Sequence, residues 1–212
     1  GILKLDKEGR ITHFVEKPQN DKERDGLESG DDPNKPYMAS MGIYVFNAEK
    51  MYDLLETNPG MEYGKNIIPE YIKPHKVMGY VFDGYWEDIG TIRRFYEVNL
   101  DMAAPLPNFN LYDPNTPIYT RPRFLAASKI QGGTLNNVLL ADGCRIAEAT
   151  IRNSVIGLRS IIAAGVSIER SIVMGADYYQ LQDEHEDYWK QDQPSIGIGP
   201  DSVIQGAIID KN

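Results

Sequence analysis

The sequence predicts an α/β protein in two parts: a layered domain with a mixed sheet, followed by a left-handed parallel β-helix. In the first half, strand-like runs alternate with helical patterns, which favours a Rossmann-like layered domain. In the second half, similar apolar segments begin at Asn137, Ser154 and Ser171, a spacing of 17 residues. This period is too short for helical repeats and is typical of one triangular turn of a parallel β-helix.

The chain begins with a predicted hairpin. Residues 2–5 and 11–15 are apolar runs on either side of a break at residues 8–10 that contains Gly9, which indicates strand, turn, strand. The mostly apolar run at residues 37–46 predicts a buried strand.

Two helices have clear start signals, because Asn47 and Thr91 each precede a helical pattern with a side chain that can cap it. Between them, apolar residues at helical spacing predict a helix over 67–72, and residues 77–82 predict a further strand. The predicted apolar face of the Thr91-capped helix consists of Ile92, Phe95, Tyr96 and Leu100.

We expect the first domain at residues 1–103, a linker at 104–127 and the β-helix at 128–212. Five prolines lie between Ala103 and Arg123 without a sustained period, which suits an extended linker.

Within the repeat, glycines mark the predicted corners. Gly143 and Gly165 each stand three residues before an isoleucine, as expected where a tight corner precedes an inward-pointing side chain. The 17-residue spacing predicts that Val138, Val155 and Ile172 share one face of the β-helix.

Two further features concern what the repeat buries. Cys144, the single cysteine, excludes an intrachain disulfide and is predicted to be a small core residue rather than a reactive thiol. Residues 178–195 break the rhythm with charged and aromatic side chains, and we expect them to loop out, since their charge would spoil a buried corner.

Composition narrows the function classes. The net charge of -9, from 22 basic and 31 acidic residues, opposes a polyanion-binding surface, so nucleic acid is not an expected partner. No run approaches the roughly 20 apolar residues of a transmembrane helix, so no membrane partner is expected. A few local Lys or Arg side chains still suffice to bind a small phosphorylated substrate.

Three positions are candidates for chemistry. Pro18 favours an extended Lys17 whose amine projects from the strand end towards a phosphate, with Glu16 beside it to accept hydrogen bonds from sugar hydroxyls. Asp88 lies between a predicted strand and a capped helix, where a carboxylate can bind Mg²⁺ or simply close a turn. Ser40 is polar inside an apolar run, so it is either hydrogen-bonded internally or faces a ligand.

Taken together, the motifs of this chain are more specific than any of them alone. In their order, they resemble glucose-1-phosphate adenylyltransferase of the cyanobacterial and plant type, and the resemblance covers nearly the whole chain. The matching segments are residues 14–18 (FVEKP), 37–46 (YMASMGIYVF), 85–92 (YWEDIGTI), 117–120 (PIYT), 154–160 (SVIGLRS), 174–179 (MGADYY), 194–199 (PSIGIG) and 208–212 (IIDKN).

The resemblance implies transfer of AMP from ATP to glucose 1-phosphate, giving ADP-glucose and pyrophosphate in glycogen or starch biosynthesis. It implies that Lys17 holds the sugar phosphate and that Glu16 and Ser40 contact glucose. Asp88 would be one of two aspartates that bind Mg²⁺, which makes it the catalytic and metal-binding residue of this chain.

The resemblance also implies regulation and assembly. Arg121, Arg123 and Lys211 match positions at an allosteric site for a phosphorylated effector, although solvated surface charge is the alternative for all three. The enzyme is expected to be a homo- or heterotetramer, in the bacterial cytoplasm or, in a photosynthetic eukaryote, in the plastid.

One departure from the family pattern separates this chain from a working enzyme. The family's Gly-rich loop, its first Mg²⁺ aspartate and its adenine contacts precede the Glu-Lys-Pro segment and are not found in these 212 residues, so the chain alone is expected to be inactive.

Three alternatives stay open. The first is that the chain belongs to a regulatory subunit, the second that the enzyme uses another sugar phosphate, and the third that the β-helix is that of an acyltransferase. The last requires a histidine in a coil, and none is expected there. The three histidines are His13, His75 and His185.

Overall fold

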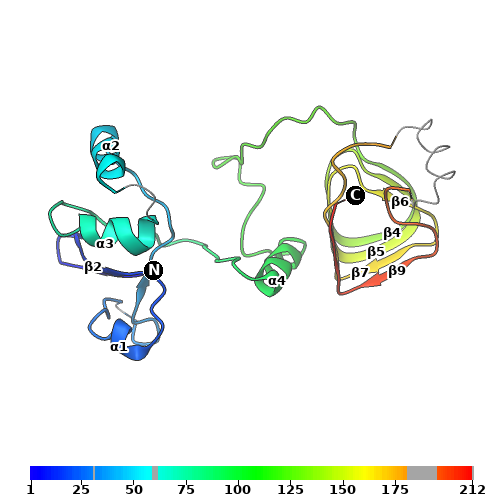
Figure 1. Cartoon of the computed structure of the whole chain (residues 1–212). Helices are drawn as coiled ribbons and strands as arrows, with labels where there is room; N and C mark the ends of the chain where they lie inside the picture. Colours follow the sequence, from blue (N-terminus) through cyan, green and yellow to red (C-terminus); the bar gives the residue numbers. More distant parts are fainter. Residues whose placement is uncertain (31, 59–61, 181–194, 212) are drawn as a thin grey trace. The chain divides into compact units, whose positions relative to one another are not determined.

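The computed structural model describes residues 1–30, 32–58, 62–180 and 195–211. The chain divides into two compact units, Gly1–Asp83 and Gly84–Asn212. The fold is mixed α/β, as predicted, and a curled parallel sheet makes up most of the second unit (Figure 1).

The first unit combines a small antiparallel sheet with helices. Its sheet has the order β2-β1-β3. Leu3, Ile11 and Phe14 of the two longer strands pack against Ile68 and Ile72 to form a buried core. The elements of this unit are β1 (Ile2–Leu5), β2 (Ile11–Val15), α1 (Asp21–Arg24), β3 (Met38–Ala39), α2 (Ala48–Thr57), the π-helix η1 (Tyr63–Ile67) and α3 (Ile68–Tyr71).

Local signals in this unit are confirmed. Asn47 caps α2 by accepting a hydrogen bond from the Lys50 N–H, and β1 pairs antiparallel with β2 as the hairpin prediction requires. The helix predicted over 67–72 forms as the end of η1 followed by α3, and it buries Ile67 and Ile68.

The buried strand predicted at residues 37–46 is wrong over most of its length. Only Met38–Ala39 forms a strand. Tyr44 and Phe46 pack on the core, whereas Ile43 and Val45 are 74% and 98% exposed. The run therefore alternates between an inward and an outward face, and its high apolar content does not imply burial on both faces.

The strand predicted at residues 77–82 is also not formed. Met78 makes a single antiparallel bridge to Arg10, and Tyr80 is 91% exposed.

The second unit contains one helix and a parallel sheet that curls on itself. In Figure 1, β4, β5, β7 and β9 lie one above another as successive layers, which agrees with the parallel pairing of β4 with β5, β5 with β7 and β7 with β9. The elements are α4 (Ile92–Met102), β4 (Lys129–Leu140), β5 (Arg145–Ile156), β6 (Ile161–Ile162), β7 (Ser167–Glu169), β8 (Ile172–Val173), β9 (Val203–Gln205) and β10 (Ile208–Ile209).

The core of the curled sheet confirms the corner prediction. Gly143 and Gly165 have φ of 75° and 76°, a conformation that glycine adopts without strain, and Ile146 and Ile168 that follow them are each 1% exposed. Cys144 is also 1% exposed, as predicted, and burial raises the pKa of its thiol.

The predicted register of the repeat is wrong by one residue in its first turn. Val138 pairs with Ser154, 16 residues on, while Val155 pairs with Ile172, 17 residues on. Since side chains alternate between the faces of a strand, Val138 and Val155 do not share a face. The extra residue lies in the turn that contains Gly165, because β5 pairs with β6 at a spacing of 16 and with β7 at 17.

A ladder of serines lines the same position in successive turns. Ser154 Oγ accepts the Ser171 N–H at 3.1 Å, and Ser171 Oγ accepts the Ala207 N–H at 3.2 Å. Both serines are fully buried, so these bonds satisfy polar groups in the core.

Most of residues 178–195 lies outside the described residues, and so does His185. β7 pairs directly with β9, and β8 pairs directly with β10. The prediction that residues 178–195 loop out of the repeat falls mostly outside the described ranges and stays a prediction.

Helix α4 packs on the β-helix within the second unit. Its Tyr96 hydroxyl donates to the carbonyl of Arg170 at 2.5 Å. Val98 is the buried residue of the helix, whereas Ile92, predicted to lie on the apolar face, is 81% exposed. That part of the prediction is wrong because Ile92 is in the first turn, before the packed part of the helix.

Candidate functional site

Glu16 and Ser40 are brought to the same end of the first unit's sheet. Ile2 of the central strand pairs with Val15 on one side and with Ala39 on the other. The next residues out are therefore Glu16 and Ser40, on either side of Gly1 and about 10 Å apart, which is two strand spacings. Gly1 contacts both, since its amino group lies 3.3 Å from Glu16 Oε2 and its carbonyl accepts the Ser40 N–H at 2.8 Å.

Ser40 is hydrogen-bonded internally. Its Oγ accepts the Gly42 N–H at 3.2 Å and lies 3.3 Å from the hydroxyl of Tyr44. The internal hydrogen bonding predicted for a serine in this run is present, and it adds Tyr44 to the polar groups at this end of the sheet.

Lys17 departs from its predicted backbone conformation. Its φ is 47°, in the left-handed region, whereas Pro18 was expected to favour an extended residue. The carbonyl of Lys17 accepts a hydrogen bond from Gln19 Nε2 at 2.6 Å, which holds the turn after β2. A non-glycine residue in this region costs on the order of 1–3 kcal/mol, and such strain is found most often at functional positions. The side chain is exposed, as its proposed role requires.

Gly64 is a residue that the sequence prediction missed. A Cβ added to it would lie 2.5 Å from Glu16 Oε2, so a larger residue at this position would require the end of the Glu16 side chain to move. The signal in the sequence is a glycine inside an otherwise helical pattern, which often marks a close approach of the backbone to another group.

Asp88 lies in the second unit, just before α4. Its Oδ1 accepts the Gly90 N–H at 3.0 Å, and the side chain is exposed. Thr91 then caps the helix by accepting the Arg94 N–H at 3.1 Å, as predicted. Both the turn and the cap are thus present, and they fix the backbone on which the Asp88 carboxylate stands.

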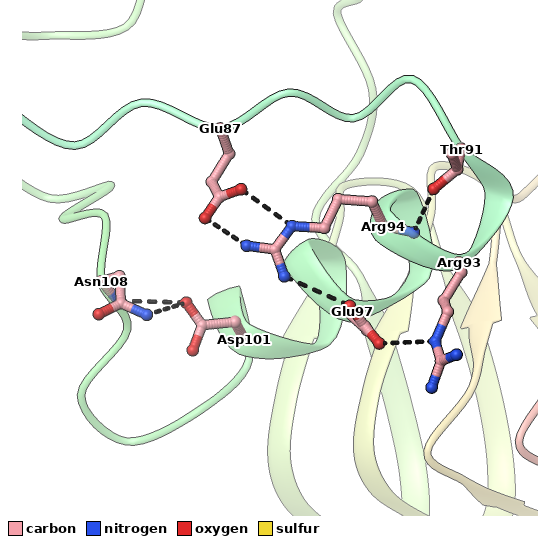
Figure 2. Close-up of polar contacts among 7 residues, drawn as sticks. All are labelled: Glu87, Thr91, Arg93, Arg94, Glu97, Asp101 and Asn108. Carbon is pink, nitrogen blue, oxygen red and sulfur yellow. Dashed lines mark hydrogen bonds and ion pairs between the residues drawn. The ribbon is translucent and has the colours of Figure 1, made fainter. Parts of the chain in front are cut away.

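Charged side chains on α4 form a chain of ion pairs next to Asp88. Figure 2 shows the guanidinium of Arg94 between the carboxylates of Glu87 and Glu97, with Arg93 on the far side of Glu97. Arg94 Nε donates to Glu87 Oε2 at 2.9 Å and Nη2 donates to Oε1, so the pair is bidentate. Hydrogen bonds to Glu87 raise the pKa of Arg94, and those from Arg93 and Arg94 hold the pKa of Glu97 below its ordinary value.

The Asp88 carboxylate suits only one kind of metal site, in which substrate phosphates supply the other ligands. Within the described part of the chain, no group of three His, Cys, Asp or Glu side chains is placed to hold an ion. Mg²⁺ bound between substrate phosphates takes one or two protein carboxylates, and a single exposed aspartate fits that need. It does not fit a site built from protein ligands alone.

The predicted effector residues lie in the second unit. Arg121 and Arg123 are exposed, and Arg123 Nη1 donates to the Arg121 carbonyl at 3.2 Å. Lys211 Nζ donates to Asp177 Oδ1 at 2.6 Å, so this lysine is engaged in an ion pair at the surface.

None of the helices in the described ranges has the length and apolar character that crossing a membrane requires.

Comparison with known families accounts for both parts of the chain. Residues 1–104 match the family model described as nucleotidyl transferase, and residues 123–212 match the model described as the GLGC left-handed parallel beta-helix domain. Together, these two matches support a sugar-phosphate nucleotidyltransferase.

Proposed function

We propose that this chain, a nucleotidyl transferase domain joined to a GLGC left-handed β-helix domain, belongs to a glucose-1-phosphate adenylyltransferase. The enzyme would transfer AMP from ATP to glucose 1-phosphate and give ADP-glucose and pyrophosphate. The observation that carries this proposal is the order of the two domains in one chain. The motifs that resemble the cyanobacterial and plant enzymes support the finer assignment.

In this proposal, the first unit binds the sugar phosphate. The Lys17 ammonium, exposed at the end of β2, would attract the phosphate by about 4 kcal/mol at 4 Å and an effective dielectric of 20, before desolvation. Glu16 and Ser40, on either side of Gly1, would accept and donate hydrogen bonds to glucose hydroxyls. Tyr44 would orient Ser40 through the 3.3 Å contact between their hydroxyls.

Nucleotidyl transfer requires little covalent participation by the protein. A phosphate oxygen of glucose 1-phosphate attacks the α-phosphorus of ATP, the bond to the β-phosphate oxygen breaks, and pyrophosphate leaves with that electron pair. Alignment and neutralisation of charge are the main requirements. Asp88 would hold Mg²⁺ at the transferring phosphates, and the metal would offset the negative charge that builds up there.

Regulation and assembly follow from the same proposal. A phosphorylated effector would bind Arg121, Arg123 and Lys211, and to reach Lys211 it would compete with Asp177 for the ammonium. The complete enzyme would be a tetramer. The 212-residue chain would not turn over alone, since these residues contain no Gly-rich pyrophosphate loop.

The test is the identification of the product. The enzyme that contains this chain is incubated with ATP, Mg²⁺ and one sugar 1-phosphate at a time, and the sugar nucleotide is identified by mass spectrometry. We expect ADP-glucose from glucose 1-phosphate, with pyrophosphate in equal amount. Preference for another sugar phosphate would overturn the substrate assignment, and no sugar nucleotide from any of them would overturn the proposed activity.

A further inference from the structure

The segment that carries Asp88 is tied to α4 at two points, and both of them involve Arg94. The backbone N–H of Arg94 donates to the capping hydroxyl of Thr91 at 3.1 Å. Its guanidinium makes the bidentate pair with Glu87, the residue immediately before Asp88. Asp88 thus lies inside a short loop whose two ends are both held by one residue of the helix.

We infer that Arg94 is a positioning residue that fixes the Asp88 carboxylate for metal binding. The inference rests on the proposed function, because it concerns how Asp88 is held rather than what Asp88 does.

The Glu87–Arg94 pair differs from the other ion pairs of α4. Arg93 and Glu97 are four residues apart on the helix, and Arg93 is 89% exposed, so their pair stays within the helix and holds no loop. Glu87 precedes the helix by several residues, its side chain is 27% exposed, and Arg94 is 42% exposed. Isolated surface pairs contribute little, but a bidentate arginine–carboxylate pair is the exception.

The Glu87–Arg94 pair also determines which of two adjacent carboxylates is available to bind a cation. Glu87 and Asp88 are adjacent, and either could bind a hard cation. Arg94 occupies both oxygens of Glu87. Asp88 uses Oδ1 for the Gly90 N–H, and among the described residues its Oδ2 has no hydrogen bond or ion pair. Asp88 Oδ2 is therefore the least engaged carboxylate oxygen of Glu87 and Asp88.

Holding that oxygen in place matters because charge compensation is sensitive to position. A displacement of 1 Å can cost a reaction about 100-fold, and loss of a residue that orients a metal ligand typically costs about 10- to 100-fold in metal affinity or activity. Loss of the Glu87 pair would leave the Thr91 cap in place and free only the segment in front of it.

The test uses Arg94→Ala, Glu87→Ala and the double variant, with Arg93→Ala as the matched control. The first readout is hydrogen exchange of the Gly90 amide in the 212-residue chain, since this amide donates to Asp88 Oδ1. The Val98 amide, in the buried part of α4, reports whether the helix stays folded. The second readout is the Mg²⁺ concentration that half-activates the enzyme containing this chain.

We expect Arg94→Ala and Glu87→Ala each to speed exchange at Gly90 by about fivefold or more, the equivalent of about 1 kcal/mol, with Val98 unchanged. The Mg²⁺ requirement should rise about 10-fold. The double variant should be no worse than Arg94→Ala, because Arg94→Ala already removes the Glu87 contact together with the pair to Glu97. Arg93→Ala should change neither readout.

Additive effects in the double variant, or an effect of Arg93→Ala equal to that of Arg94→Ala, would overturn the inference. So would unchanged Gly90 exchange in Arg94→Ala, or Val98 exchange that rises with it. The proposed role of Asp88 fails separately. If Asp88→Asn keeps normal turnover while Arg94→Ala still speeds exchange at Gly90, the Glu87–Arg94 pair holds the segment but Asp88 does not bind the metal.

Discussion

Ile151 provides the sharpest test of the β-helix core. Its side chain is 0% exposed in the middle of β5, which pairs with β4 on one side and β7 on the other. Ile151→Ala removes three carbon groups, which accounts for about 2.4 kcal/mol at roughly 0.8 kcal/mol each. The cavity left between the layers adds to this, so we expect a total loss of about 3 to 4 kcal/mol.

The matched control is Ile130→Ala in β4. The chemical change is the same, but Ile130 is 47% exposed, so the expected loss is about 1 kcal/mol or less. The assay is hydrogen exchange of the β5 amides across a urea series, which reports the stability of this unit by itself. Equal losses for the two variants would refute the assignment of Ile151 to the core.

Two further predictions concern charged residues. Lys17→Ala in the enzyme that contains this chain should raise the KM for glucose 1-phosphate by about 100-fold or more and leave the KM for ATP nearly unchanged. Steady-state kinetics measures both constants. Equal changes in the two would indicate a fold defect instead. The pKa of Asp177 lies below its ordinary value, chiefly because Lys211 donates a hydrogen bond to it. The stability that this carboxylate contributes is therefore fully present above about pH 4, the unfolded pKa, and is lost as the pH falls through the lower folded pKa. Lys211→Ala should move that pKa back up towards the usual range in an NMR titration, and no movement would mean that Lys211 is not the cause.

Features of the fold that depend on neighbouring residues in the sequence could be predicted. Asn47 and Thr91 cap their helices because the cap is made to an amide three residues away. Gly143 and Gly165 mark corners because only the local backbone conformation matters there. The repeat itself was visible because each turn buries the same kind of side chain.

Features that depend on distant contacts could not be predicted. The register slip arises from one extra residue in the turn around Gly165, and spacing alone does not show where a turn is longer. Val98 faces the β-helix and Ile92 does not, and this follows from how α4 docks rather than from its pattern.

The candidate site divides in the same way. Motifs in the sequence predict Glu16, Lys17, Ser40 and Asp88 as candidates, but the closeness of Glu16 to Gly64 depends on how η1 packs. The Glu87–Arg94 pair joins a loop to a helix over several residues, beyond the spacings at which helical side chains are known to pair.

The most direct test of the account is the turnover of Asp88→Asn across a Mg²⁺ titration, in the enzyme that contains this chain. The amide keeps the shape of the side chain, and it can still accept the Gly90 N–H, but it removes the negative charge proposed to hold Mg²⁺ at the transferring phosphates. We predict that turnover collapses at every Mg²⁺ concentration while the affinity for glucose 1-phosphate changes by no more than a few fold. Near-normal turnover at the Mg²⁺ concentration that saturates the unaltered enzyme would contradict the account and leave Asp88 as a turn residue.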